Sequence, residues 1–179
     1  IIRWADDFII GCELKNDAHR VMAVLPKRFE RFKLSLHPDK TQLIEFGRPR
    51  SDEQGRSRGT FDFLGFTFHW GKTLKGYWVI KKKTARKRRN RFMKQLWRWC
   101  KANRHEPMAE QHATLSSKLR GFYQYFGVRS NYKALEVVFE YAEKAWRRWL
   151  SRRSSKGTVL FEDLCRRYPL PKPRIVHHI

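Results

Sequence analysis

The first residues of the chain alternate between apolar runs and a single acidic pair. Residues 1–11 read IIRWADDFIIG, so β-branched and aromatic side chains stand on both sides of Asp6 and Asp7. Two short runs of this composition around a tight polar pair are typical of a β-hairpin. The pattern therefore predicts a hairpin over residues 1–11 with the two aspartates at its tip.

A helical pattern follows the predicted hairpin. Apolar residues recur at steps of three and four from Ala18 to Phe32, which is the spacing of one helix face. The side chain of Asn16 or Asp17 is expected to cap the start of this helix. Pro26 stands inside the run and is expected to kink the helix or divide it in two.

The middle of the chain has the pattern of strands and loops. An HPD sequence breaks the helical pattern, and residues 41–46 then have the composition of a strand. Residues 47–60 are polar and contain glycines, which predicts a loop. The apolar residues 61–69 and 77–80 predict two further strands, joined by a turn in the glycine-bearing segment 71–76.

The remaining residues predict helices, because three apolar stripes recur at helical spacing. The stripes consist of Phe92, Leu96 and Trp99, then Leu115, Leu119, Phe122 and Phe126, then Leu135, Val138, Phe139, Ala142, Trp146 and Trp149. Residues 168–179 carry three prolines and are expected to be extended. The change of pattern near residue 80 predicts an α+β protein with a β-rich part, 1–80, and a helical part, 81–179.

Charge and composition indicate what the protein binds. Forty Lys and Arg against 17 Asp and Glu give a net charge of +23, and 15% of the residues are aromatic. Because such a charge costs self-repulsion in the folded state, it indicates a polyanionic partner, most simply nucleic acid. The alternative is a ribosomal-type or merely basic protein. A hydrophobic content of 41% excludes wholesale disorder.

The sequence argues against several other classes of protein. It has no apolar run near 18 residues and no signal-peptide pattern, so no membrane partner is expected. Its three cysteines stand far apart, which excludes the CxxC spacing of zinc sites and fits a reducing environment. The expected location is a bacterial-type cytoplasm, with the protein held close to nucleic acid.

The acidic pair is a candidate metal site. Adjacent carboxylates at a hairpin tip repel each other, and a bound divalent cation removes that cost. Magnesium takes hard oxygen ligands from one or two carboxylates, and two such ions can stabilise the attacking and leaving oxygens of a phosphoryl transfer. The alternative is an ordinary solvated turn, since aspartate is common in turns.

The acidic pair and four segments that follow it along the chain resemble sequence motifs of one known family. WADD between apolar strands resembles the YxDD box of reverse transcriptases, most often YADD in the group II intron family. In the family's order, LHPDKT at 36–41 resembles the next polymerase motif, and FDFLGF at 61–66 resembles the primer-grip hairpin. KLRGFYQYFGV at 118–128 and PLPKPRIVH at 169–177 resemble the maturase-specific thumb, or domain X.

This resemblance implies a fold and an activity. The fold would be a partial polymerase palm, an antiparallel sheet with a packed helix, over 1–80, followed by a three-helix RNA-binding thumb over 81–179. The activity would be RNA-directed DNA polymerisation, a nucleotidyltransferase reaction, coupled to splicing of a mobile intron. The implied partners are intron and template RNA, a DNA primer and dNTP substrates, with Mg²⁺ as cofactor.

The resemblance also assigns catalytic residues. Asp6 and Asp7 would ligate the catalytic magnesium ions, and Lys40 would help to protonate the departing pyrophosphate. An ammonium group near a triphosphate stabilises developing negative charge and can donate a proton, so this role is physically sound. The alternative for Lys40 is an ordinary surface lysine.

Substrate contacts are assigned in the same way. Trp4 and Ala5 would bind the nucleotide, and Leu64 and Gly65 the primer, which can approach a glycine closely. The alternative for Gly65 is a bulge or bend in a strand. Trp4 stands where the family usually has Tyr, so an aromatic floor is kept while the phenol hydroxyl is lost.

The family's other metal-binding aspartate lies upstream of the matched region, as do the fingers. Neither Asp39 nor Asp62 matches that position. The chain is therefore expected to be a C-terminal fragment that polymerises nothing by itself. Two alternatives remain open, a non-catalytic RNA-binding splicing cofactor and a decayed reverse transcriptase remnant.

The basic segment 81–104 is the candidate RNA-binding region. It contains twelve Lys or Arg, no acidic residue and several aromatics, and it is expected to form a helix that tracks a groove of RNA. Trp97 lies off the apolar stripe and is the better candidate for stacking on a base. The alternative, favoured for Phe92, Leu96 and Trp99, is that the aromatics form the core stripe and only the charges face outward. The proposed RNA-binding residues are Lys81, Lys82, Lys83, Arg86, Arg89, Trp97, Arg120, Arg147 and Arg148.

Overall fold

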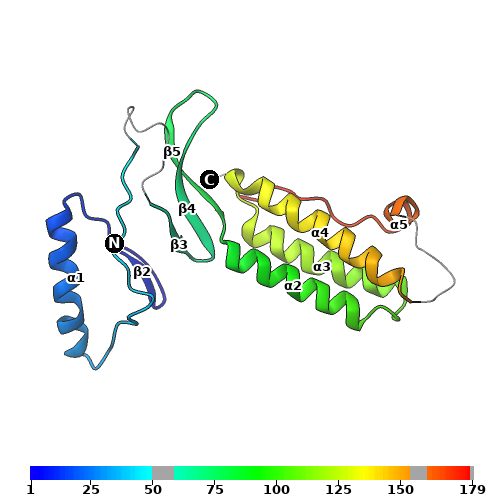
Figure 1. Ribbon diagram of the computed structural model, residues 1–179, viewed down its shortest axis with the longest axis horizontal. Helices are drawn as coiled ribbons and strands as arrows, with labels where there is room; N and C mark the ends of the chain where they lie inside the picture. Colours follow the sequence, from blue (N-terminus) through cyan, green and yellow to red (C-terminus); the bar gives the residue numbers. More distant parts are fainter. Residues whose placement is uncertain (50–58, 154–160, 178–179) are drawn as a thin grey trace. The chain divides into compact units, whose positions relative to one another are not determined.

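The computed structural model describes residues 1–49, 59–153 and 161–177, which form two units (Figure 1). Unit 1 comprises Ile1–Leu64 and His69–Val79, and unit 2 comprises Gly65–Phe68 and Ile80–Ile179. Helices and small antiparallel sheets are both present, so the predicted α+β class is confirmed. No helix within the described ranges is long and apolar enough to cross a bilayer.

Unit 1 begins with the predicted hairpin. Strands β1 (Ile2–Trp4) and β2 (Asp7–Ile9) pair antiparallel, with Trp4 opposite Asp7. The loop between them is therefore only two residues, Ala5 and Asp6, and Asp7 is the first residue of β2. The hairpin is confirmed, and the acidic pair straddles the end of its turn.

Helix α1 (Lys15–Glu30) contains the predicted apolar spacing, but the predicted cap was wrong and the helix is not divided. The N-cap is Leu14, without a side-chain cap, because the Leu14 carbonyl already accepts from the Ala18 amide and Asn16 lies inside the helix. Pro26 lies inside the continuous helix, so it does not divide it, although its missing N–H removes one backbone hydrogen bond. The kink expected there stays a prediction.

The strand predicted at residues 41–46 is wrong, because this segment is irregular. An extended run needs a neighbouring strand to pair its backbone, and none of the described strands lies beside it. Phe46 instead contacts Phe61 edge-on at 4.9 Å and stacks on Trp70 at 5.7 Å between ring centres. The predicted loop at 47–60 lies partly outside the described residues.

The second sheet has the strand order β3-β4-β5, formed by β3 (Phe61–Phe63), β4 (Phe66–Lys72) and β5 (Trp78–Thr84). The stretch 61–69, predicted as one strand, is a hairpin, because Leu64 and Gly65 form a turn between β3 and β4. Strand β5 also runs further than predicted, through Lys81–Lys83, which were expected to belong to a helix. It continues because later residues pair with its backbone, as described below.

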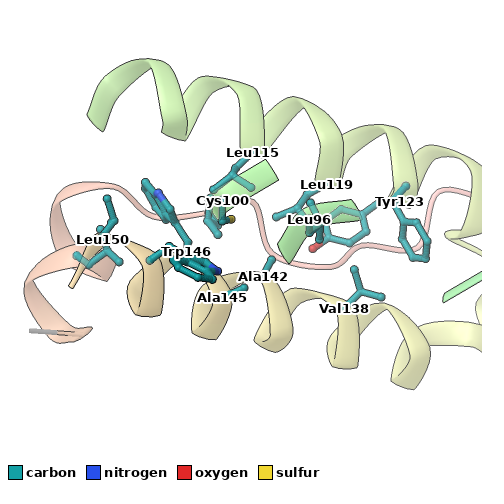
Figure 2. Packing of buried hydrophobic residues seen from close by; sticks show 14 of the residues in the cluster. Leu96, Cys100, Leu115, Leu119, Tyr123, Val138, Ala142, Ala145, Trp146 and Leu150 are labelled. Atoms are coloured by element: carbon teal, nitrogen blue, oxygen red, sulfur yellow. The ribbon is translucent and has the colours of Figure 1, made fainter. Parts of the chain in front are cut away.

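Unit 2 is built on the three predicted helices, which are confirmed. They are α2 (Arg86–Ala102), α3 (Met108–Phe126) and α4 (Tyr132–Leu150), with a 3₁₀ turn, η1 (Arg129–Asn131), before α4. A short helix, α5 (Phe161–Arg167), was not predicted. The apolar faces of the helices meet in one buried cluster (Figure 2), whose largest members include Leu96, Leu115, Leu119, Leu135, Trp146 and Leu150.

The segment after α5 is extended, as predicted, and runs along α3. The His112 ring contacts the Pro169 carbonyl at 2.9 Å, and the His177 ring contacts the Gln124 carbonyl at 2.7 Å. The amides of Val176 and His177 both donate to the Gly127 carbonyl. A side chain at Gly127 would lie 2.9 Å from the Arg174 carbonyl, so glycine allows this close approach.

Candidate catalytic hairpin and nucleic-acid interface

The β1–β2 tip has an unusual backbone. Ala5 has φ +51°, in the left-handed region that residues with a side chain rarely adopt. This conformation costs about 1–2 kcal/mol for an L-residue. The Arg3 side chain donates a hydrogen bond of 2.8 Å from Nε to the Ala5 carbonyl, which holds the turn. Sequence reasoning missed this feature, because alanine carries no signal for a positive φ.

The two carboxylates of this tip are both accessible. Asp6 and Asp7 are exposed, and neither forms an ion pair with a described residue although the chain is strongly basic. Two exposed carboxylates supply the hard oxygen ligands that magnesium prefers, so the donor chemistry fits. Within 1–49, 59–153 and 161–177, no group of three or more His, Cys, Asp or Glu could hold a metal ion.

Lys40 and Trp4 occupy exposed positions in the same unit. Lys40 ends a turn in which the amides of Lys40 and Thr41 both donate to the His37 carbonyl. No ion pair joins Lys40 to Asp6 or Asp7 in the described part of the chain. Trp4 is 68% exposed beside the tip, so its ring is accessible to a ligand.

The predicted primer-contacting residues form the β3–β4 turn. Leu64 has φ +49° and Gly65 has φ +78°, the pair of positive angles of a type I′ hairpin turn. The alternative of a bulge at Gly65 is therefore wrong. The Gly65 carbonyl accepts from the Ala85 amide at 2.9 Å, just before α2 begins.

Two side chains that the sequence analysis did not identify fasten the end of β5 within unit 2. The Ser130 hydroxyl accepts from the Lys82 amide at 3.1 Å and donates to the Lys82 carbonyl at 2.6 Å. Buried Asn131 accepts from the Thr84 amide at 2.7 Å and donates to the Thr84 hydroxyl and to the Phe126 carbonyl. Their only sequence signal is a polar pair between two helices.

Helix α2 presents cations outward while its apolar stripe is buried. Leu96 and Cys100 are buried in the core. The exposed cations on this helix are Arg86, Lys87, Arg88, Arg91, Lys94, Arg98 and Lys101. A shallow groove follows the same helix, lined by Lys87, Asn90, Arg91, Lys94, Gln95 and Arg98. A row of cations along a helix can follow a phosphate backbone.

The proposed RNA-binding residues differ in their exposure. Lys83, Arg86, Arg120, Arg147 and Arg148 are exposed. The half-buried members are Lys81, Lys82 and Arg89, and the Arg89 Nε is buried without a hydrogen-bond partner among the described residues. Arg89 is therefore less accessible to a phosphate than its neighbours on α2.

The interpretation of Trp97 as lying off the apolar stripe is wrong. It is partly buried against the core and meets Trp149 edge-on, with ring centres 5.3 Å apart. The Arg148 guanidinium lies 5.7 Å from the centre of the Trp97 ring. The stripe is wider than three positions, because the Trp97 ring contacts both Tyr141 and Trp149 of α4. Trp97 is therefore a packing residue with a cationic neighbour.

The cysteines of unit 2 are not activated thiols. Burial raises the pKa of Cys100 to about 12, so this thiol stays protonated. Burial also raises the pKa of Cys165, and Glu143, 3.7 Å from its sulfur, adds to this effect. These groups therefore give no support to nucleophilic chemistry in unit 2.

Comparison of the chain with models of known protein families, with curated proteins and with solved structures found no match.

Proposed function

We propose that this chain is the palm-and-thumb portion of a group II intron-encoded reverse transcriptase and maturase, which polymerises DNA on an RNA template and binds its intron RNA. The observation that carries the proposal is the pair of exposed carboxylates at the β1–β2 tip. In a chain of net charge +23, these carboxylates form no ion pair with any described residue and are available to a metal ion. The four motif-like segments that accompany them support the same family.

The catalytic part of the proposal rests on the tip itself. Magnesium would position the primer end and the triphosphate and would stabilise the negative charge that develops between them. Asp6 and Asp7 would hold the ion through their exposed oxygens, as part of a larger set of ligands. Trp4 would offer its exposed ring to the nucleotide, and Lys40 would supply positive charge and a proton to the leaving group.

The RNA-binding part of the proposal rests on unit 2. Its buried core leaves the cations of α2 on the surface, and the end of α4 adds Arg147 and Arg148. Lysine and arginine side chains release condensed counterions from phosphates, which gives most of the affinity for a nucleic acid. Arginine can also bind a phosphate through two parallel hydrogen bonds.

The catalytic proposal is tested by primer extension with the complete protein that carries this chain, on an RNA template with a DNA primer and Mg²⁺. Asp6→Asn should lower extension by at least about a thousandfold, because the metal loses a charged ligand. Asp17→Asn removes an exposed carboxylate from α1 and should leave extension unchanged. Equal activity of the wild type and Asp6→Asn would refute the catalytic role.

The second candidate function is a non-catalytic splicing cofactor that binds intron RNA. Trp4 in the position usually held by tyrosine favours it, because the phenol hydroxyl is lost. Under this alternative the wild type binds intron RNA tightly and stimulates splicing, but extends no primer. Measuring both activities on the same protein preparation therefore separates the two candidates.

The RNA-binding proposal predicts which cations matter most. Replacing Lys87, Arg91 and Lys94 by Glu should weaken RNA binding by at least about tenfold, and each lost phosphate contact should reduce the slope of log affinity against log salt by about 0.7–0.9. The matched control replaces Lys27, Arg28 and Arg31, which lie in and just after α1 in unit 1. An unchanged slope in the α2 variant would contradict the assignment.

A further inference from the structure

An exposed aromatic ring lies near the end of α3 and packs against two other aromatic rings. Tyr125 is 54% exposed and stacks on Phe66, with ring centres 5.8 Å apart and ring planes 16° from parallel. Phe126 lies edge-on to Tyr125 at 4.7 Å and to Phe66 at 5.1 Å. Aromatic rings in these arrangements stabilise one another, so Tyr125 is held in place while more than half of it faces solvent.

The backbone next to the Tyr125–Phe66 ring pair is also held in place by a hydrogen bond. The carbonyl of Gly65, directly before Phe66, accepts from the Ala85 amide. A side chain at Gly65 would meet the Phe126 ring at 3.5 Å, so the turn lies directly on that ring. Because the Tyr125 ring is already held in place, the protein would lose little conformational entropy when a ligand stacks on it.

Cations flank the same ring pair. The Lys82 ammonium lies 5.9 Å from the centre of the Phe66 ring, and Ser130 fixes the Lys82 backbone through two hydrogen bonds. Arg88 is exposed, and its side-chain stem passes 3.6 Å from the position that a Cβ on Gly65 would occupy. Both cations therefore stand within a side chain's length of the stacked rings.

We propose that Tyr125 and Phe66, with Lys82 and Arg88 beside them, bind an unpaired nucleobase at the end of a nucleic-acid strand. The base stacks on the exposed Tyr125 ring, because every base has a π-face and an unpaired base has no neighbour on one side. Lys82 and Arg88 contact the adjoining phosphates. This inference rests on the proposed function of unit 2 in binding nucleic acid and adds the strand end as its particular target.

The ligand chemistry distinguishes this site from the cation row of α2. A row of cations contacts phosphates and binds a blunt duplex as well as an overhang. An aromatic platform requires a base that has left the duplex stack. The two kinds of contact therefore respond differently to a single unpaired nucleotide.

The test compares the affinity of the protein for a blunt duplex with that for the same duplex carrying one unpaired terminal nucleotide. The wild type should bind the overhang about five- to a hundredfold more tightly, the range expected for stacking one base on an aromatic side chain. Tyr125→Leu should abolish this difference, and Tyr125→Phe should retain it. Tyr77→Leu, at an exposed tyrosine that stacks on no described ring, should also retain it.

The outcomes separate this inference from the function on which it rests. If the wild type binds neither duplex in a salt-dependent manner, the nucleic-acid function of unit 2 fails. If both duplexes bind with equal affinity, or if Tyr77→Leu abolishes the preference as completely as Tyr125→Leu does, the platform is refuted while the nucleic-acid function stands. RNA and DNA overhangs, measured in parallel, show which kind of strand end the site prefers.

Photocross-linking gives a second test, because it identifies the peptide that lies next to the bound base. A 4-thiouridine at the unpaired position should cross-link on irradiation to the peptide that contains Phe122–Phe126 or to the one that contains Phe66. Cross-links confined to α2 would overturn the assignment. Tyr125→Leu should lower the yield of the α3 cross-link at least about fivefold at saturating protein, where occupancy no longer limits it.

Discussion

The two units of this chain bury their apolar side chains to very different extents. In unit 2 the side chains of Leu115, Leu119 and Leu135 are completely buried. In unit 1, helix α1 contains no buried residue, and Trp4 and Phe32 are 68% and 73% exposed. Both units carry the periodic patterns of regular structure, so the pattern alone does not decide burial.

The difference follows from how many layers each unit contains. A helix or a sheet buries its apolar face only against another element, and α2, α3 and α4 cover one another in this way. Helix α1 has the short β1–β2 hairpin beside it, with Phe8 stacked on Phe29 at 6.0 Å. A two-stranded hairpin is marginally stable in water, so unit 1 is expected to be the less stable of the two.

The largest expected effect tests the core of unit 2. Trp146→Ala should lower the free energy of unfolding by about 3–5 kcal/mol, because a buried tryptophan leaves a large cavity. It also leaves the Gln111 side-chain carbonyl without the indole N–H that lies 2.9 Å from it. The measurement is urea unfolding followed by helical circular dichroism, with α2–α4 as the main source of the signal.

The control for this change lies in unit 1. Trp4→Ala removes the same side chain from an exposed position and should alter stability by less than about 0.5 kcal/mol. If the two tryptophan variants were destabilised equally, the contrast between the units would be wrong. Hydrogen exchange offers an independent check, because amides of α3 and α4 should exchange more slowly than those of α1.

The next effect tests the fastening of β5 within unit 2. Asn131→Ala should lower the free energy of unfolding by about 1–3 kcal/mol, because it leaves the buried Thr84 amide without its hydrogen-bond acceptor. Exchange of the Thr84 amide should accelerate with it, whereas the amides of α4 should change little. Loss of protection spread evenly over α4 would show that Asn131 supports the helices rather than the strand.

A smaller effect is expected at the hairpin of unit 1. Ala5→Gly should stabilise the β1–β2 hairpin by up to about 1 kcal/mol, because glycine adopts φ +51° without the steric cost of a side chain. Slower amide exchange in residues 2–9 would report it. The same substitution at Ala18, inside α1, should instead destabilise its surroundings by about 1 kcal/mol, which makes it the opposite-sign control.

Local patterns predicted the parts of the molecule that depend on neighbours in the sequence. The stripes of α2, α3 and α4 and the β1–β2 hairpin follow directly from residue spacing and composition. The contacts of Ser130 and Asn131 with Lys82 and Thr84 join residues 47 or 48 apart, and no local pattern contains them. Helix α5 has seven residues, too few for helical periodicity to be recognised.

Some features of the candidate sites could likewise be predicted from local sequence, whereas others depend on contacts between distant residues. The acidic pair could be found from the strands that flank it, whereas the left-handed Ala5 beside it could not. Trp97 was misjudged because its environment depends on the packing of Trp149 from another helix. The stacked pair of Tyr125 and Phe66 also escaped sequence reasoning, since the two residues meet only when β4 lies on the end of α3.

The smallest expected effect concerns a carboxyl group at the edge of the core of unit 2. Burial raises the pKa of Glu143, so the folded protein holds this proton more tightly than the unfolded chain does. The stability that this adds is fully present below the ordinary pKa of about 4.5 and is lost as the pH rises through the raised value. Glu143→Gln removes the titration.

Tm curves of the wild type and Glu143→Gln, measured across acidic to neutral pH, give the test. The difference should favour the variant increasingly as the pH rises above about 4.5 and should then level off. Glu140→Gln is the matched control, because Glu140 lies three residues away on α4 and is more than half exposed, beside Lys144. An identical pH dependence in both variants would show that burial of Glu143 has no measurable effect, and the edge of the core would then be as open to solvent as unit 1.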